Sequence, residues 1–355
     1  MRIVHIIGGL NRGGIENFVY NHLKVLSNEH KFHIIAFSEE ANAMFEDFAK
    51  IDCQIHYVKP LREQGLLSYY KVVNKKLKKI KPDVVHSHSM QKSGLDCMIA
   101  YFSGVKVRVA HSHNTKHEFD NKLKSKIVLW IFKILIKFFS NKKLACGEDA
   151  GIYLYGKRSK YEVFLNSIFI DDFLHDRDKS AFLSKRVLFV GRLSKQKNPI
   201  FALKIISRYI EKYDNDIILT IIGTGNMKDE VLEYINREGL NNNVDYVGTV
   251  NNVDDYLKKN NYLIMPSLYE GLPVALIEAQ ISGIECIVSD SITREADLKL
   301  SNIHFLSIQD IDVWIKKIHD LLPSSLTKEK VRNSKFVQMY DVRKSSKRLI
   351  KIYEE

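Results

Sequence analysis

Residues 266–278 read PSLYEGLPVALIE and carry two glutamates, Glu270 and Glu278, eight positions apart. The apolar run at 262–265 (YLIM) predicts a buried parallel strand, and the run at 274–282 predicts a helix that ends at a glycine. Glu270 therefore falls on a strand-to-helix loop, and Glu278 falls inside the helix. Because a helix rises 1.5 Å per residue, eight positions span roughly 12 Å.

The turn between the two glutamates offers a place for an anion. The backbone N–H groups of Gly271 and Leu272 lie beside Pro273 at the helix start, where backbone donors attract negative charge. The spacing suits a nucleotide-diphosphate sugar, with one glutamate on sugar hydroxyls, the other on ribose hydroxyls and the diphosphate between them. This stretch alone also fits an ordinary Glu-Gly turn followed by a solvated helical glutamate.

Strand and helix signals alternate along both halves of the chain, which predicts two Rossmann-like, doubly wound parallel-sheet domains facing across a cleft. We place the first domain at 1–165 and the second at 166–337, with a polar linker at 166–185. In such sheets ligands bind at the carboxyl ends of the strands, and each motif below falls at such an end. The expected strands are 3–7, 31–37, 83–86 and 105–110 in the first half, and 187–190, 217–222, 245–248, 262–265 and 285–289 in the second.

The composition is that of a globular protein, with 355 residues, 45% apolar and 27% charged. Four scattered cysteines argue against a disulfide framework or a zinc ribbon and favour a reducing cytosol. The apolar run at the N-terminus is too short for a signal peptide, and no segment reaches the ~18 uninterrupted apolar residues of a membrane span.

The positive charge is concentrated in the first half. Of the net +12, residues 1–165 contribute all, with 27 Lys+Arg against 15 Asp+Glu, while residues 166–355 hold 27 of each. Residues 121–143 hold seven lysines and no acid among Ile, Leu, Phe, Val and Trp, so we expect a cationic amphipathic helix. We expect most of its apolar face to be core and its lysine stripe to face an anionic membrane. Its stripe consists of Lys122, Lys126, Lys133 and Lys137.

Two glycine-rich loops follow strands. Gly13 and Gly14 open the first helix, and Gly223 and Gly225 follow the strand at 217–222. Glycines there let backbone N–H groups approach an anion. The first loop is not the Gly-x-Gly-x-x-Gly fingerprint, and the next two strands lack a clear acidic ribose partner, which argues against a nicotinamide dehydrogenase.

Two cations follow the first strand of the second domain. Arg192 and Lys197 could neutralise a diphosphate and stabilise it as a leaving group. A solvated basic loop is the alternative for this segment taken alone.

Two His-x-His pairs end strands of the first domain, His86 with His88 and His111 with His113. Each pair shares one face of its strand. A zinc site is disfavoured because no Asp or Glu is well placed to complete it, so we expect no metal. One histidine contacting a sugar hydroxyl fits better, with the others in the core.

Together these motifs resemble the retaining glycosyltransferases of family 4, which have the two-domain GT-B architecture. The resemblance covers nearly the whole chain. Residues 270–278 look like the family's Glu-x7-Glu motif, within a Ser-x-x-Glu-Gly-x-Pro context. Arg192 and Lys197 match the family's Arg/Lys pair. Gly13 and Gly14 match its N-terminal Gly-Gly loop, and Gly223 and Gly225 match its second glycine loop.

The resemblance implies roles for these residues. Glu270 would contact donor sugar hydroxyls, Glu278 the ribose, and the 271–273 backbone the diphosphate. His113 aligns best with the family's histidine near the donor sugar, with His111 next. The family uses no bound metal and no cofactor, and its implied mechanism is front-face displacement, in which the departing phosphate oxygen takes the acceptor proton.

The resemblance also implies a setting. Similar proteins build bacterial capsule, exopolysaccharide or O-antigen repeats on a lipid carrier, and UDP-sugars are the commonest donors. We therefore expect a cytoplasmic enzyme held peripherally on the inner face of the cell membrane, whose first domain binds the acceptor. A C-terminal helix at 338–355 would pack back on that domain.

Two departures and three rival functions remain. The family's interdomain Asn-Gly is Asn166-Ser167 here, and residues 289–295 (SDSITRE) replace glycines near the donor sugar, which leaves the donor open. The rivals are a GT-B nucleotide-sugar epimerase, a non-catalytic nucleotide-sugar-binding protein and a nucleic-acid-binding protein. An epimerase would need acidic catalytic residues in the first domain, and none is well placed there. A nucleic-acid-binding protein would need a recognisable motif, and the sequence shows none.

Overall fold

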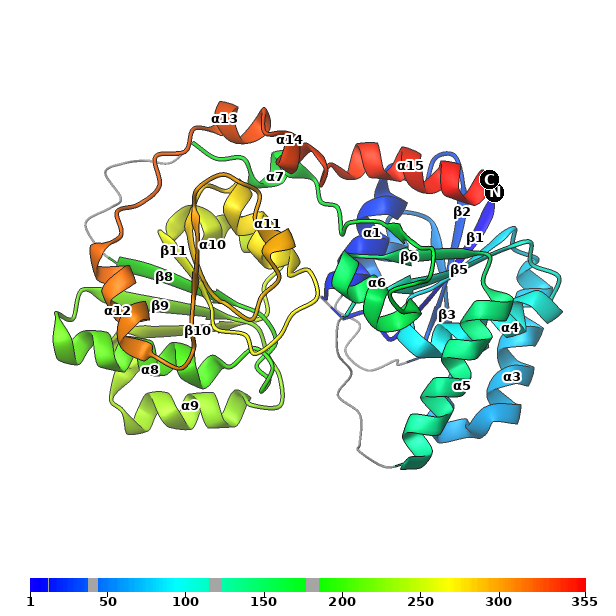
Figure 1. The fold of residues 1–355 in the computed structure, drawn as a ribbon, viewed down its shortest axis with the longest axis horizontal. Coiled ribbons are helices and arrows are strands. Elements are labelled where there is room, and N and C mark those ends of the chain that lie inside the picture. The colour runs from blue at the N-terminus through cyan, green and yellow to red at the C-terminus, as the bar shows by residue number, and fades with distance from the viewer. Residues whose placement is uncertain (12, 38–43, 115–122, 177–184) are drawn as a thin grey trace. The chain divides into compact units, whose positions relative to one another are not determined.

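A computed structural model of the chain describes residues 1–11, 13–37, 44–114, 123–176 and 185–355. The chain divides into two compact units, unit 1 (Met1–Ile168 with Met339–Glu355) and unit 2 (Phe169–Gln338). Each unit is a parallel β-sheet covered by helices (Figure 1), so the predicted pair of Rossmann-like α/β domains is confirmed.

Within the described residues, unit 1 has a seven-stranded sheet in the order β3-β2-β1-β4-β5-β6-β7, and every neighbouring pair is parallel. The strand order reverses direction between β1 and β4, and ligands bind at such a switch point in this class of fold. Its strands are β1 (Arg2–Ile7), β2 (Lys31–Ala36), β3 (Cys53–Tyr57), β4 (Val84–Ser87), β5 (Val107–Ser112), β6 (Lys142–Ala145) and β7 (Glu162–Val163). Its helices are α1 (Gly14–Leu26), α2 (Phe45–Ala49), α3 (Leu61–Ile80), η1 (Met90–Lys92), α4 (Ser93–Phe102), α5 (Leu123–Phe139), α6 (Glu148–Tyr155) and α15 (Val342–Glu354).

The C-terminal helix α15 completes the core of unit 1. Its buried residues Leu349, Ile352 and Tyr353 belong to the same apolar cluster as Ile3 of β1 and Phe18 of α1. An amphipathic helix gains most of its stability from such burial. The last helix in the chain is thereby part of the first domain (Figure 1).

Within the described residues, unit 2 has a six-stranded parallel sheet in the order β10-β9-β8-β11-β12-β13. Its strand order reverses direction between β8 and β11. Its strands are β8 (Lys185–Val190), β9 (Ile217–Ile222), β10 (Val244–Gly248), β11 (Tyr262–Met265), β12 (Glu285–Ser289) and β13 (Ile303–Leu306). Its helices are α7 (Ile170–Phe173), α8 (Pro199–Lys212), α9 (Lys228–Arg237), η3 (Leu240–Asn242), α10 (Val253–Lys259), α11 (Val274–Ile281), η4 (Arg294–Ala296), α12 (Ile311–Asp320), α13 (Lys328–Arg332) and α14 (Lys335–Gln338).

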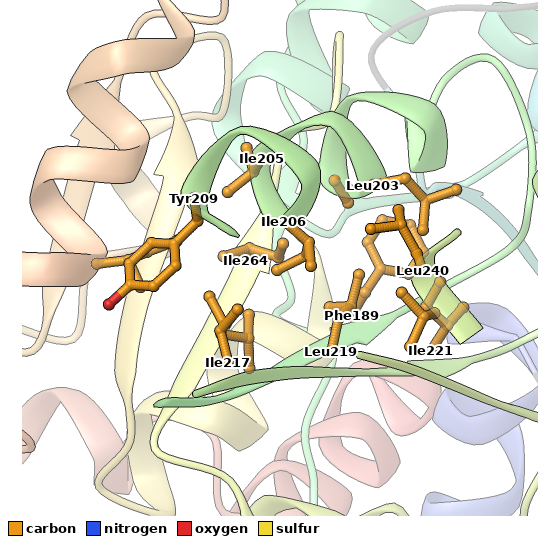
Figure 2. Packing of buried hydrophobic residues seen from close by; sticks show 14 of the residues in the cluster. Phe189, Leu203, Ile205, Ile206, Tyr209, Ile217, Leu219, Ile221, Leu240 and Ile264 are labelled. Atoms are coloured by element: carbon orange, nitrogen blue, oxygen red, sulfur yellow. The ribbon is translucent and has the colours of Figure 1, made fainter. Parts of the chain in front are cut away.

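Helix α8 shows how the unit 2 core forms. Its buried residues recur at helical spacing, so one face packs on the sheet. Figure 2 shows Ile206 and Tyr209 of this helix against Ile217 and Leu219 of β9. This packing fixes where the loop before α8 leaves the sheet.

Several element boundaries differ from the sequence prediction. Strand β5 continues to Ser112, so His111 lies within the strand. Strands β3, β6, β7 and β13 were not predicted, because they are short, their burial is only partial and their apolar patterns are weak. In the described part of the chain, no helix has the length and apolarity needed to cross a membrane.

Candidate functional site

An ion pair joins the two motifs at the centre of the unit 2 sheet. Lys197, on the loop after β8, donates from Nζ to Glu270 Oε1 at 2.6 Å. Glu270 lies on the loop after β11, and β8 and β11 are neighbours in the sheet. The side chains are 20% and 6% exposed, so the pair is largely shielded from water. The sequence placed both residues in one site but did not predict their pairing.

Three hydrogen bonds hold the two loops together around this pair. The Leu268 backbone N–H donates to the Gln196 carbonyl at 2.8 Å, and Gln196 Nε2 donates to the Tyr269 carbonyl at 2.9 Å. Asn198 Nδ2 donates to the Pro266 carbonyl at 3.2 Å. The sequence analysis missed these positioning residues, which flank the motif lysine.

Arg192 takes a different position on the same loop. Its side chain is exposed, and in the described part of unit 2 no hydrogen bond or ion pair holds its guanidinium. It follows Gly191, whose φ of 155° favours glycine. The guanidinium is therefore free to turn toward an anion at this end of the sheet.

The start of α11 retains its anion-binding capacity. No side chain caps the helix, whose N-cap residue is Pro273. Leu272 is buried, and Gly271 is partly buried beside Glu270. The first N–H groups of a helix lack intrahelical partners, so this end attracts a negatively charged group.

Glu278 lies in α11, as the sequence predicted, and its side chain is partly buried. Burial, with a contribution from the negative charge of Asp254, raises the pKa of Glu278 to about 7. Among the described residues, no hydrogen bond or ion pair satisfies its carboxylate. A shielded, unsatisfied carboxylate is suited to accept hydrogen bonds from ligand hydroxyls. Asp254, on α10, is a neighbour that the sequence pattern did not reveal.

The glycines at 223 and 225 have a structural reason to be glycine. A Cβ on Gly223 would lie 2.0 Å from the Gly191 carbonyl oxygen, and one on Gly225 would lie 2.3 Å from the Leu193 carbonyl oxygen. The two loops pack backbone to backbone, with Leu193 N–H donating to the Thr224 carbonyl at 3.0 Å. This packing supports the loop that carries Arg192, whether or not these glycines also contact a ligand.

The glycine pair of unit 1 lies at the start of α1. Gly13 is the N-cap residue in an extended conformation, and Gly14 is the first helical residue. A Cβ on Gly13 would meet only the flexible end of the Glu16 side chain, at 2.5 Å. No side chain caps α1, so its N–H groups are also available to an anion. Residue 12 lies outside the described residues.

The four predicted histidines of unit 1 converge, and His5 of β1 joins them. His88 Nδ1 is 2.8 Å from His113 Nε2, and His88 Nε2 is 3.0 Å from His5 Nδ1. His86 Nε2 is 3.1 Å from His111 Nδ1. Burial lowers the pKa of His113 to about 3 and that of the other members as well, so the rings are neutral.

Helix α5 exposes more apolar surface than the sequence predicted. Phe132 and Ile136 are buried, whereas Trp130 is 64% and Phe138 is 72% exposed. The expectation that most of the apolar face is core was therefore wrong. The helix packs mainly on α4 (Figure 1), and its two buried residues join apolar clusters that include strand residues. Tyr101 and Phe102 of α4 are exposed beside Phe139 at the end of α5.

The lysine stripe of α5 is only partly outward-facing. Lys126 and Lys137 are exposed. Lys133 instead turns inward and donates to the Tyr153 carbonyl at 2.7 Å. Lys122 lies outside the described residues.

Comparisons with known proteins agree on one class. The profile of "Glycosyl transferases group 1" matches residues 173–334, and that of "Glycosyltransferase Family 4" matches residues 12–142. The chain is 30% identical to the putative glycosyltransferase EpsF of Bacillus subtilis, covering 99% of this chain and 96% of that protein. It is 28% identical to an Escherichia coli UDP-Gal:alpha-D-GlcNAc-diphosphoundecaprenol alpha-1,3-galactosyltransferase, covering 90% and 86%.

The fold has solved counterparts. A structure of HepE from Anabaena in complex with UDP-glucose superimposes with a TM-score of 0.78 at 14% identity, covering 100% of this chain and 99% of that one. TarM superimposes with a TM-score of 0.76 at 13% identity, covering 100% and 99%. At this identity the likeness concerns the fold alone.

Proposed function

This chain belongs to the family 4 glycosyltransferases, and on that premise we propose that it transfers a sugar from a UDP-sugar to a lipid-linked saccharide. Its relatives include a Staphylococcus aureus capsular polysaccharide glycosyltransferase and enzymes named for undecaprenol-linked acceptors. Capsule, exopolysaccharide or O-antigen assembly is the corresponding role for this chain. The observation that carries the proposal is the shielded Lys197–Glu270 pair at the centre of the unit 2 sheet.

The donor would be held by unit 2. Glu270 accepts hydrogen bonds from sugar hydroxyls, and Glu278 accepts them from the ribose. The diphosphate lies at the uncapped start of α11, over the 271–273 backbone. Arg192 and Lys197 add two cations at the same strand ends. The glycines at 13–14 and 223–225 would let backbone N–H groups approach the donor.

The reaction retains the configuration at the anomeric carbon. The bond from that carbon to the diphosphate oxygen breaks, and the bond to the acceptor oxygen forms on the same face. The acceptor proton passes to the departing phosphate oxygen. Lys197 and Arg192 stabilise the negative charge that develops on the leaving group, so this step needs no metal and no cofactor.

The predicted contact of His113 with the donor sugar stays a prediction. Its Nε2 is hydrogen-bonded to His88, and its Nδ1 is buried. It is therefore not part of the transfer step proposed here.

Unit 1 would bind the acceptor and the membrane. The exposed apolar residues of α5, together with Lys126 and Lys137, form a surface that suits the interface of an anionic bilayer. A lipid-linked acceptor would bring the enzyme to the inner face of the cell membrane. Peripheral attachment of a cytoplasmic protein follows from these two features.

The test incubates the purified chain with a panel of radiolabelled nucleotide sugars and a polyprenyl-diphosphate saccharide in detergent. We expect transfer from one UDP-sugar, with the new linkage retaining the donor's anomeric configuration by NMR. Glu270→Gln is the inactive control. Donor binding without transfer to any acceptor would favour a nucleotide-sugar-binding protein, and conversion of the free donor to its epimer would favour an epimerase. Either result would overturn the proposal.

A further inference from the structure

Two exposed leucines follow a kink near the start of helix α3. Gly65 interrupts the helix with φ 76° and ψ 167°, a conformation that favours glycine, and the helix then resumes. Leu66 and Leu67, the next two residues, are 54% and 78% exposed. We propose that these leucines insert into an anionic bilayer and that, with the lysines after them, they form a second membrane contact besides that of α5. This contact rests on the membrane-bound acceptor proposed above, and it adds where unit 1 would touch the bilayer.

Three lysines continue the outward face of α3 from Leu67. Lys71, Lys75 and Lys78 follow at intervals of four, four and three residues, so they lie on one face of the helix with that leucine. The opposite face carries the buried residues of the helix. All three lysines are exposed, and among the described residues none of them makes an ion pair. Unpaired positive charge beside an exposed leucine complements the anionic headgroups and the apolar interior of a bilayer.

The exposed apolar side chains of unit 1 gather in one layer of helices. Helices α3 and α5 both pack against α4, on the same side of the unit 1 sheet (Figure 1). In the described part of unit 1, only Phe45 and Met339 among the exposed large apolar side chains lie outside these three helices. Helices α1 and α15 pack on the other face of the sheet and expose none. Such a one-sided apolar surface is typical of an interaction site.

Positive charge alone does not distinguish this layer. Helix α15 is also basic, with exposed lysines at Lys344, Lys347 and Lys351. Its large apolar side chains are not exposed, and Lys351 Nζ lies 3.9 Å from a carboxylate oxygen of Glu355. An acidic protein or a nucleic acid could bind either helix by charge, whereas a bilayer also takes up apolar side chains. The leucines beside unpaired lysines therefore favour a bilayer as the partner of α3, and α15 provides a comparison within the same unit.

The two leucines lie near the edge of the sheet where ligands bind in this class of fold. Helix α3 begins shortly after the end of β3, so its first turns lie toward the carboxyl ends of the strands. Leu66 and Leu67 belong to these first turns. A bilayer held there would bring a lipid-linked saccharide to the carboxyl edge of unit 1 while its lipid stays in the membrane.

The first test reports directly on insertion. All four native cysteines are buried, so Leu67→Cys can be labelled selectively with an environment-sensitive fluorophore. On adding phosphatidylglycerol-containing vesicles, we expect the emission to shift to the blue and to become shielded from an aqueous quencher. Phe45→Cys, labelled in the same way, is the matched control, because Phe45 is exposed on α2 and this helix packs on the other face of the sheet. An unchanged emission from Leu67→Cys bound to vesicles would overturn the proposal.

The second test measures affinity by vesicle sedimentation. Leu66→Ser combined with Leu67→Ser should weaken binding about tenfold or more, because two leucines no longer enter the apolar interior. Replacing the three α3 lysines with glutamine should weaken binding on the order of 100-fold. The same replacement of the three α15 lysines should leave binding largely unchanged. Equal losses from the two lysine sets, or wild-type binding by the leucine variant, would overturn the α3 contact. Urea unfolding checks that each variant is folded.

Activity separates this contact from the proposed sugar transfer. A water-soluble, short-chain analogue of the acceptor needs no bilayer, so the leucine variant should use it as fast as the wild type does. The same variant should be slower than the wild type on an acceptor embedded in vesicles, and equal rates there would overturn the membrane contact. No transfer by the wild type to either acceptor would contradict the proposed function alone, because label emission and sedimentation still decide whether α3 contacts the bilayer.

Discussion

Lys197 and Glu270 lie 73 positions apart in the chain, and their side chains meet at 2.6 Å. Each comes from a loop at the end of one of two adjacent parallel strands, β8 and β11. The electrostatic interaction within an ion pair that is largely shielded from water is screened less than that of a pair on the surface. The pair therefore holds a cation ready beside the carboxylate that would bind the sugar.

Removing this cation should stop transfer while the protein still folds. We expect Lys197→Met to lower kcat by about 100-fold or more, because the leaving diphosphate loses a charge-assisted donor. We also expect a loss of about 1–3 kcal/mol in the free energy of unfolding, since Glu270 loses its cation in a shielded position. Lys195→Met is the control, because Lys195 is exposed on the same loop. Steady-state kinetics and urea unfolding check both effects, and equal kcat for the two variants would contradict the role given to Lys197.

The glycine loops of unit 2 allow steric and conformational effects to be separated. Gly225→Ala brings a Cβ to 2.3 Å from the Leu193 carbonyl oxygen, and we expect it to destabilise unit 2 by about 2–3 kcal/mol. Gly248 has a φ of 78° with nothing within 4 Å of a Cβ, so Gly248→Ala should cost only about 1–2 kcal/mol of backbone strain. Gly223→Ala combines both effects and should be the worst. Urea unfolding of the three variants gives the order, and a Gly225→Ala protein as stable as wild type would show that the loops do not need this packing.

The sequence predicted the two domains because both parallel sheets depend on local signals. Short apolar runs such as 262–265 form buried strands, and the loops after them hold the polar residues. The strand-end rule therefore located Glu270 and Lys197 in one site. It could not predict their ion pair, because that depends on the sheet register and on the hydrogen bonds made by Gln196 and Asn198.

Other features required packing information that no local pattern holds. His86 meets Tyr353 across 267 positions, and this contact depends on α15 packing on unit 1. The glycine at 225 is required by a carbonyl group of another loop, which a search for phosphate-binding motifs does not detect. Much of the apolar surface of α5 stays exposed because α4 and the sheet cover only the side of the helix that carries Phe132 and Ile136, an asymmetry that the hydrophobic pattern did not reveal.

The exposed surface of α5 should bind anionic bilayers. We expect Trp130→Ala to weaken binding to phosphatidylglycerol-containing vesicles about tenfold, because a large side chain is lost from the interface. Binding should also weaken with added salt, since Lys126 and Lys137 contribute electrostatically. Vesicle sedimentation measures both effects. Leu322→Ala is the control, since Leu322 is 79% exposed but lies in unit 2; an equal loss in this variant would place the membrane surface elsewhere.

Glu278 should make both stability and donor binding depend on pH. Its pKa is raised to about 7 from an ordinary value of 4.5, so the folded state binds more protons than the unfolded state between these values. The stability of the wild-type protein relative to Glu278→Gln should therefore fall as the pH rises from about 4.5 to 7 and stay constant above pH 7. The total fall should be on the order of 1 kcal/mol after allowing for the partial exposure of the side chain. Urea unfolding across this range measures the difference.

Donor affinity should change in the opposite direction. The ionised carboxylate is the stronger acceptor for ribose hydroxyls, so we expect the Kd for UDP-glucose to decrease as the pH rises through about 7. UDP-glucose is the right probe because its diphosphate has no group that titrates in this range. Asp254→Asn removes a negative charge that helps to raise the pKa of Glu278, so it should move the midpoint to lower pH without abolishing the transition. Glu278→Gln should abolish it. Calorimetric titration at several pH values checks this, and an unchanged profile in Glu278→Gln would assign the pH dependence, and the ribose contact, to another group.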